Sequence, residues 1–252
     1  ESVPDPVFAQ KMVGDGLSLD PTSGELLAPV SGVVTQLHQA HHALTITTTE
    51  GLEVLVHIGI DTVLLKGEGF TPAVKQGDQV KTGQVLIRFD VDLVARKARS
   101  LLTQILIANV EKVARFLPVS GLVEAGKTVV LSLELAAEAA VQAQAGSHAA
   151  ITGEAVSLPN PSGLHARPAA VLAAEAKKFK SDVRLVRGSD EANAKSVVAI
   201  MGMATRQNDS VTIRAAGPDA NEAIRALSAL LAAGCGEAAG EAPTVAETSA
   251  PA

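Results

Sequence analysis

Short runs of alternating apolar and polar residues fill the first half of the chain. Four runs rich in β-branched side chains, separated by glycine-containing turns, lie at residues 33–37, 44–47, 52–56 and 84–89. A period of two over such short runs is typical of β-strands. Only residues 92–98 and their immediate flanks show a helical pattern, which is too short to organise a domain. The pattern therefore predicts an all-β sandwich or barrel-like domain over residues 1–135.

The second half alternates strand and helix patterns. Strands are predicted near residues 153–158, 183–186 and 211–214, and helices at residues 168–179, 197–201 and 219–234. Pro168 suits the first turn of the first helix, and Ser196 suits the N-cap of the second. Asp219 begins a capping-box-like start of the third helix, and Gly234 suits its end. These features predict a small α+β open-faced sandwich over residues 152–235.

Two segments lack large apolar residues and any strand pattern. Residues 136–151 are rich in Ala, Glu and Gln, and we expect a linker there. Residues 236–252 are rich in Pro, Ala, Glu, Thr and Ser, and we expect a disordered tail or a linker to a further domain.

Composition narrows the class of protein. The chain has 252 residues, 47% hydrophobic content, a net charge of −6, five Phe and no Trp or Tyr. Without a basic surface or many stacking rings, nucleic acid is not an expected partner. The sequence has no apolar stretch near the roughly 20 residues of a membrane span, so direct membrane insertion is not expected. The one cysteine, Cys235, is expected to be a plain linker thiol. These features predict a cytoplasmic protein.

One histidine motif lies at the start of a predicted helix. His165 comes three residues before Pro168, where free backbone N–H groups and the positive end of the helix dipole favour an anion. Arg167 adds a cationic fork suited to phosphate oxygens. The motif predicts a site that holds a phosphoryl group on or beside His165. By itself, a histidine cap beside a surface arginine is the alternative.

A longer match supports the phosphoryl interpretation. Residues 158–170 and 193–197, in the order strand, helix, strand, helix, strand, helix, resemble the histidine-containing phosphocarrier (HPr) family of the bacterial sugar phosphotransferase system. The resemblance implies that His165 accepts a phosphoryl group from enzyme I and that Arg167 assists transfer. Ser196 matches a regulatory phosphorylation site of some members, although its N-cap role is sufficient.

The first half carries a second resemblance. Five segments look like the glucose-type enzyme IIA family, a β-sandwich phosphocarrier: residues 6–16, 28–32, 42–44, 56–63 and 66–70. This resemblance implies that His57 carries the phosphoryl group and that His42 is its partner. An imidazole is a competent nucleophile toward phosphorus, and a second imidazole can donate a hydrogen bond to the transferred oxygens.

Strand alternation refines the IIA assignment. It places His57 on the face opposite Val54, Val56 and Ile58, so that the ring points out of the core. Asp61 is expected either to fix the tautomer or to cap a turn. Three further histidines are expected to face solvent: His38, His41 (pointing away from the adjacent strand residue His42) and His148.

Three other classes of protein are alternatives. A zinc hydrolase using His41, His42 and His57 lacks a diagnostic carboxylate spacing, and adjacent strand histidines point apart. A lipoyl- or biotinyl-type carrier is suggested by residues 74–86, but the chain has no Met-Lys-Met-like hairpin. A binding module that regulates partners according to its phosphorylation state stays open.

The favoured hypothesis is a phosphohistidine relay, with phosphotransferase activity and with no cofactor and no metal. Phosphoryl would pass from enzyme I to His165, then to His57, and then to a membrane sugar permease (enzyme IIB/IIC). The combination of domains looks like a multiphosphoryl transfer protein of the N-acetylglucosamine type, with glucose as the alternative sugar. In such a protein an enzyme I domain would follow Ala252.

Overall fold

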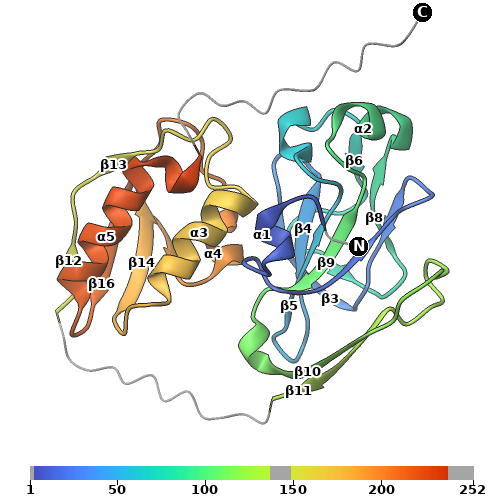
Figure 1. Cartoon of the computed structure of the whole chain (residues 1–252), viewed down its shortest axis with the longest axis horizontal. Helices are drawn as coiled ribbons and strands as arrows, with labels where there is room; N and C mark the ends of the chain where they lie inside the picture. The colour runs from blue at the N-terminus through green and yellow to red at the C-terminus, as the bar shows by residue number, and fades with distance from the viewer. Residues whose placement is uncertain (1–2, 137–148, 238–252) are drawn as a thin grey trace, which may run out of the picture.

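The computed structural model describes residues 3–136 and 149–237. The predicted linker and tail fall largely on residues 137–148 and 238–252, which lie outside the described residues. The described chain forms a β-sheet-rich first part and a mixed α/β second part that lie side by side (Figure 1). The predicted fold class, β-sheet-rich and then α+β, is confirmed.

The first part contains three antiparallel sheets. A six-stranded sheet has the order β1-β9-β5-β4-β3-β7, a three-stranded sheet the order β2-β8-β6, and β10 and β11 form a separate pair. The strands are β1 (Asp15–Leu19), β2 (Glu25–Leu27), β3 (Gly32–Leu37), β4 (Ala43–Thr47), β5 (Glu53–His57), β6 (Phe70–Pro72), β7 (Gln79–Val80), β8 (Val85–Phe89), β9 (Thr103–Ile107), β10 (Val113–Pro118) and β11 (Leu131–Leu135). The helical segments are α1 (Pro6–Ala9), η1 (Thr62–Leu65), α2 (Val91–Lys97) and η2 (Val110–Lys112).

Side chains of the two larger sheets make one apolar core. Val54, Val56 and Ile58 share it with Leu86 and Ile87 of β8, and all five are almost fully buried. Alternation along β5 sends Leu55 to the opposite face, where it joins a second apolar cluster that extends into the other part of the chain. The central strand β5 therefore has apolar packing on both faces.

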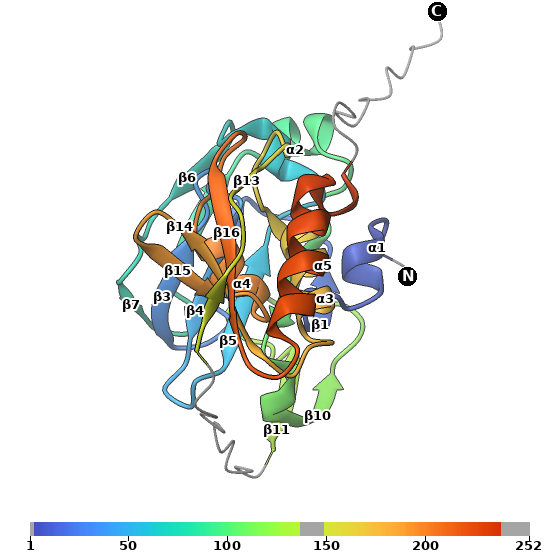
Figure 2. The same ribbon diagram turned by 90° about the vertical axis from the view of Figure 1, so that its left-hand side faces the viewer.

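The second part is an antiparallel sheet with helices on one face. Its elements are β12 (Ile151–Thr152), β13 (Val156–Ser157), α3 (Ala166–Ala176), β14 (Asp182–Arg187), β15 (Asp190–Asn193), α4 (Val197–Gly202), β16 (Ser210–Ala216), α5 (Ala220–Ala232) and η3 (Gly234–Gly236). The strand order is β12-β16-β14-β15, and β13 also pairs with β16. Figure 2 shows α3 and α5 beside this sheet.

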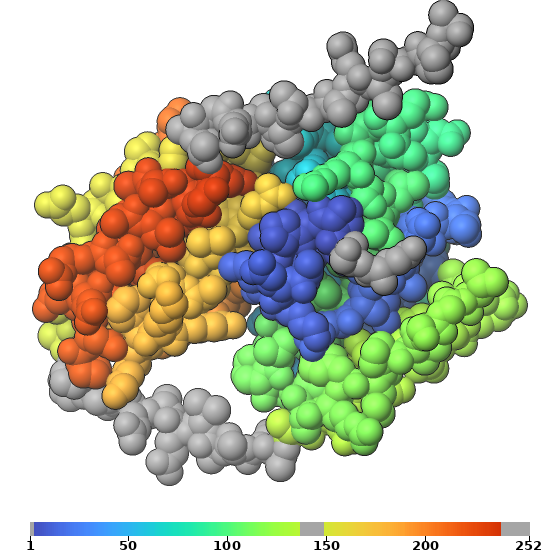
Figure 3. Space-filling view, viewed as in Figure 1, coloured from blue at the N-terminus to red at the C-terminus, as the bar shows by residue number. Residues whose placement is uncertain are grey.

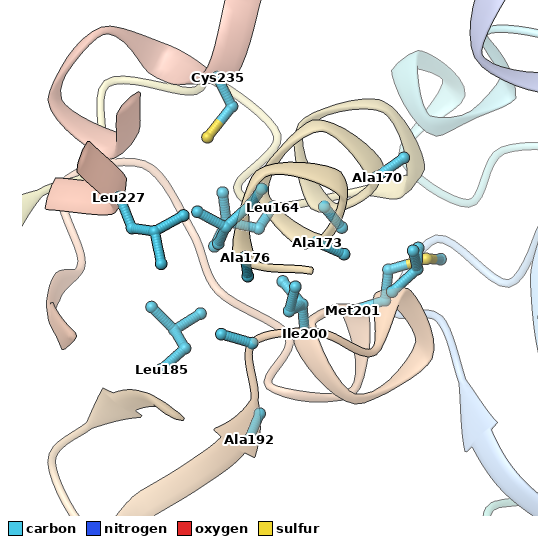
Figure 4. Packing of buried hydrophobic residues seen from close by; sticks show 14 of the residues in the cluster. Leu164, Ala170, Ala173, Ala176, Leu185, Ala192, Ile200, Met201, Leu227 and Cys235 are labelled. Carbon is cyan, nitrogen blue, oxygen red and sulfur yellow. The ribbon is translucent and has the colours of Figure 1, made fainter. Parts of the chain in front are cut away.

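Small residues on α3 let the helices approach closely. Ala173 and Ala176 are buried against Ile200 of α4 and Leu185 of β14 in the apolar cluster of Figure 4. Cys235 also lies in this cluster, with its sulfur turned inward (Figure 4). Burial, followed by the charge of Glu237, raises the pKa of Cys235 to about 12. The expectation of a plain linker thiol was wrong, because η3 folds back onto α3.

The observed elements differ from the predicted ones at a few places. The strand expected near residues 153–158 is two short strands, β12 and β13, and β15 was not predicted because its residues are mostly polar. Asp219 precedes α5 but does not cap it, since its carboxylate accepts hydrogen bonds from the backbone N–H groups of Lys180 and Ser181 instead. Gly234, with φ of +73°, follows the C-cap of α5 as predicted.

Candidate functional site

The two parts meet across a continuous apolar surface. Val7, Phe8 and Leu55 of the first part belong to the same buried cluster as Leu164 and Ala166 of the second. In the space-filling view, the N-terminal segment (blue) lies directly against the second part (Figure 3). Both predicted phosphoryl-carrying histidines lie at this contact.

His57 ends β5 on the face opposite Val54, Val56 and Ile58, as alternation predicted. His57 is 5% exposed, and its ring lies beside that of Phe8, with the two ring centroids 5.2 Å apart. The carbonyl of Gly59 lies 2.9 Å from Nδ1, and a carbonyl can only accept, so Nδ1 carries the proton and Nε2 has a free lone pair. Burial lowers the pKa of His57 to about 4 despite this hydrogen bond. The ring is a neutral base with one available nitrogen.

His42 lies beside His57 in the same site. The two ring centroids are 4.8 Å apart in an edge-to-face arrangement, and His42 is 1% exposed. Burial, followed by the charge of His57, lowers the pKa of His42 well below its usual range. Nδ1 of His42 is buried and has no hydrogen-bond partner among the described residues.

The remaining histidines differ from expectation. His41 and His42 are not strand residues: they lie in the turn before β4, where His41 has φ of +53° and is half-buried. His38 is half-buried and does not simply face solvent, and its ring centroid lies 4.5 Å from that of His42. Burial, followed by the charges of His165 and His41, lowers the pKa of His38 to about 4. His148 lies outside the described residues.

His165 is the N-cap residue of α3, and its side chain makes no capping hydrogen bond. Its Nε2 lies 2.7 Å from Oε1 of Glu237, whose other carboxylate oxygen accepts from the side-chain amide of Asn160 at 2.7 Å. Burial raises the pKa of Glu237. The hydrogen bond with His165 and the charge of His165 lower it, Asn160 and Arg167 lower it further, and the pKa ends below its usual value. An ionised carboxylate can only accept, so Nε2 carries the proton and Nδ1 is free.

Arg167 connects the two parts. Its Nη2 donates to Asp5 at 2.5 Å and to Asp61 at 3.2 Å. Burial alone lowers the pKa of Arg167, but Asp5, Asp61 and Glu237 raise it above its usual value. Among the described residues, Asp61 donates or accepts no hydrogen bond with His57, so Gly59, and not Asp61, fixes the His57 tautomer.

Asp5, Gly59 and Glu237 were not singled out from the sequence. Asp5 looks like the N-cap of α1, and its Oδ1 does accept from the N–H of Val7 at 2.8 Å. Its second role, with Arg167, depends on residues 162 positions away. Ser196, the predicted regulatory residue, is half-buried, and its hydroxyl accepts from the N–H of Ala199 as the N-cap of α4.

A small cavity lies between the two histidines. Its volume is about 20 Å³, and the residues that line it include His57, His165, Arg167, Asp5 and Asp61. This is room for about one water molecule. Among the described residues, no group of three or more His, Cys, Asp or Glu side chains is arranged to hold a metal ion. No helix in residues 3–136 or 149–237 is long and apolar enough to cross a bilayer.

Comparison with known proteins agrees with this architecture. Residues 1–113 match the family model of the phosphoenolpyruvate-dependent sugar phosphotransferase system EIIA 1, and residues 152–233 match that of the PTS HPr component phosphorylation site. A glucose-specific EIIA component from Haemophilus influenzae is 46% identical over 134 residues, which cover 53% of this chain and 81% of the relative. One from Halalkalibacterium halodurans is 49% identical over 116 residues, which cover 46% of this chain and 67% of the relative.

Two solved structures are also similar. The glucose permease IIA from Mycoplasma capricolum is 37% identical and covers 51% of this chain and 84% of its own, with a TM-score of 0.48. A phosphocarrier protein HPr from Bacillus anthracis is 36% identical, and the match covers 33% of this chain and 98% of that protein, with a TM-score of 0.31.

The match defines the class: the chain consists of phosphocarrier components of the sugar phosphotransferase system, and is a phosphotransferase. More specifically, it belongs to the glucose-type EIIA family in its first part and to the HPr family in its second, as a fusion of the two.

Proposed function

We propose that this fusion passes a phosphoryl group from Nδ1 of His165 to Nε2 of His57 within one molecule. The observation that carries the proposal is that both histidines line one cavity across the contact between the two parts. In each ring the other nitrogen is already held by an acceptor, Glu237 or Gly59. Both free nitrogens are thus available for the same phosphorus.

The step balances without moving a proton. The P–N bond to Nδ1 of His165 breaks and returns its electron pair to that nitrogen, while the lone pair on Nε2 of His57 forms the new P–N bond. Nε2–H of His165 continues to donate to the Glu237 carboxylate, and Nδ1–H of His57 continues to donate to the Gly59 carbonyl. These acceptors stabilise whichever ring carries the phosphoryl group and the extra positive charge.

The other predicted residues have roles in this transfer. The guanidinium of Arg167, beside the cavity, stabilises phosphoryl oxygens, and Asp5 and Asp61 hold it in place. His42, whose buried Nδ1 has no partner in residues 3–136 and 149–237 and whose ring lies next to His57, donates a hydrogen bond to the arriving phosphoryl group. Asp61 acts on the site through Arg167. Ser196, whose hydroxyl oxygen accepts from the N–H of Ala199 at the start of α4, is the candidate regulatory phosphorylation site.

Partners follow from the direction of the relay. Enzyme I loads His165 from phosphoenolpyruvate, and His57 delivers to the enzyme IIB domain of a membrane permease, so the protein works in the cytoplasm. We propose N-acetylglucosamine as the sugar, with glucose as the alternative, because the combination of domains looks like that type. Competition between purified glucose and N-acetylglucosamine permeases for phosphoryl from His57 distinguishes the two.

We assign the EIIA domain to residues 1–135 and the HPr domain to residues 152–235.

The test is intact-mass analysis of acid-labile phosphate after incubation with enzyme I and phosphoenolpyruvate. The parent should carry two phosphates, His57→Ala one and His165→Ala none. His41→Ala, in the same turn as His42, is the matched control and should carry two. A parent that carries none contradicts the relay and returns the chain to a regulatory binding module.

A mixing experiment tests transfer within one molecule. His57→Ala chains have an intact donor, and His165→Ala chains have an intact acceptor. Tethering gives the two domains an effective concentration of about the millimolar range. In a micromolar mixture, phosphate should therefore reach His57 much more slowly than in the parent, and at a rate that rises with concentration. Equal rates would show transfer between molecules.

A further inference from the structure

We propose that His38 is a positioning residue of the phosphoryl site, whose ring holds His42 in the orientation that faces His57. This inference deepens the proposed relay and rests on it. Neither histidine motif of the sequence includes His38, and the chain was expected to expose it.

The turn between β3 and β4 fixes the position of His38. Its backbone N–H donates to the carbonyl of Ala43 at 2.9 Å, and its carbonyl accepts from the N–H of His41 at 2.8 Å. His41 takes the left-handed conformation that this turn needs. The turn is therefore closed by two backbone hydrogen bonds and brings His38 back beside His42.

The His38 ring has a defined tautomer. The backbone N–H of Ala40 donates to Nδ1 of His38 at 3.1 Å, so Nδ1 must present its lone pair and Nε2 carries the proton. The ring is neutral at physiological pH, because burial and then the charges of His165 and His41 lower its pKa to about 4. A ring tied at one nitrogen to its own turn cannot rotate freely.

The His42 ring is packed against neighbouring rings, and a backbone hydrogen bond with Ala40 is the one influence that raises its pKa. Its Nδ1 has no hydrogen-bond partner in the described chain. Three aromatic rings surround it edge to face: His38 at 4.5 Å, His57 at 4.8 Å and Phe70 at 6.4 Å between ring centroids. Edge-to-face contacts restrict the rotation of a ring about its side-chain torsions. His38 is the nearest of the three and lies in the same turn.

The three histidines therefore have different roles in the transfer. His57 accepts the phosphoryl group, His42 donates a hydrogen bond to it, and His38 keeps the His42 ring from turning away. His38 needs no contact with the phosphoryl group for this role.

Three variants at one position separate the properties of His38. His38→Phe keeps a ring against His42 but has no nitrogen for the Ala40 N–H. His38→Asn keeps a side-chain acceptor near that N–H but has no ring. His38→Ala keeps neither. Thermal unfolding confirms that each variant is folded before kinetics are measured.

The readout is the single-turnover rate of transfer from His165 to His57, with the rate of loading of His165 by enzyme I as the internal control. We expect His38→Ala and His38→Asn to slow transfer about tenfold, the size of one aromatic contact, and to leave loading unchanged. His38→Phe should transfer within about twofold of the parent. Parent-like transfer by His38→Ala, slow transfer by His38→Phe, or equal loss of loading and transfer would each overturn the inference.

A spectroscopic readout does not depend on the relay. In ¹⁵N-labelled protein, the imidazole nitrogens of His42 should show one ordered ring environment in the parent and in His38→Phe, and exchange broadening in His38→Ala. Identical His42 spectra in all variants would contradict the positioning role. If instead the parent itself never phosphorylates His57, the proposed function fails and these spectra still test the placement of His42.

Discussion

The guanidinium of Arg167 lies 2.5 Å from the carboxylate of Asp5, a residue 162 positions away in the sequence. The Asp5 side chain is 4% exposed, and that of Arg167 is 33% exposed. The same guanidinium nitrogen also contacts Asp61. One cation at the start of α3 is thus held by two carboxylates of the EIIA domain, directly beside the cavity that both histidines of the proposed relay line.

Removing the Arg167 side chain should weaken the contact between the two domains. Arg167→Ala leaves the buried Asp5 carboxylate without its partner, which typically costs about 2 kcal/mol or more. We expect transfer from His165 to His57 to slow by roughly thirtyfold or more. The measurement is rapid-quench analysis of phosphate on each histidine. Arg184→Ala, which removes a half-exposed arginine of β14, is the control, and an Arg167→Ala rate within twofold of the control would contradict the role of this contact.

Glu237 should matter because it holds the proton on Nε2 of His165. Glu237→Gln keeps an oxygen acceptor but loses the charge that stabilises the phosphorylated ring. Charge-assisted hydrogen bonds contribute about 1.5–3 kcal/mol. We expect loading of His165 by enzyme I to slow about tenfold or more in steady-state assays. The exposed Glu222 of α5 is a matched site, and Glu222→Gln should load at the parent rate.

Acid should destabilise the folded protein through its buried histidines. The pKa values of His38 and His57 are about 4 in the folded protein, against 6.5 for an exposed imidazole. Their contribution to stability is therefore present above pH 6.5 and is lost as pH falls from 6.5 toward 4. At pH 5 the loss is up to about 2 kcal/mol for each ring.

Chemical denaturation at pH 7.5 and pH 5 measures this loss. The double variant His38→Phe with His57→Phe should show a smaller fall in the free energy of unfolding than the parent. The same fall in both proteins would mean that these rings are not neutral in the folded state.

Gly163 is required by the loop that leads to His165. Its φ is +63°, and an added Cβ would lie 1.9 Å from the carbonyl oxygen of Thr205. Gly163→Ala should destabilise the protein by about 2 kcal/mol or more through backbone strain and overlap. Gly188 has a similar φ of +59° with nothing near its Cβ position, so Gly188→Ala measures the strain alone. Equal losses in thermal denaturation would exclude the close contact as a cause.

Local sequence predicted much of the fold. Strands with regular alternation, such as β5 and β16, the placement of Pro168 in the first turn of α3 and the N-cap of α4 were found because they depend on neighbouring residues. β15 was missed because its residues, mostly polar, have no apolar alternation and pair through the backbone with β14. The side chain of Asp219 was misassigned because a partner 38 residues away competes for it.

The candidate site was predictable only in part. His57, His165, His42 and Arg167 lie in motifs, and the structure brings all four to one contact. Glu237 was not predictable, since its partner His165 lies 72 positions away. His38 was expected in solvent because its partial burial depends on the closed turn, which places its ring against that of His42.

The most direct test of the relay is a single-turnover time course with catalytic enzyme I and limiting phosphoenolpyruvate. Phosphate on His165 and His57 is quantified separately by peptide mapping after alkaline quench. The relay predicts that phosphate appears first on His165 and then on His57 as the first signal decays, and that His165→Ala shows neither. Phosphate that reaches His57 in His165→Ala at the parent rate would contradict it.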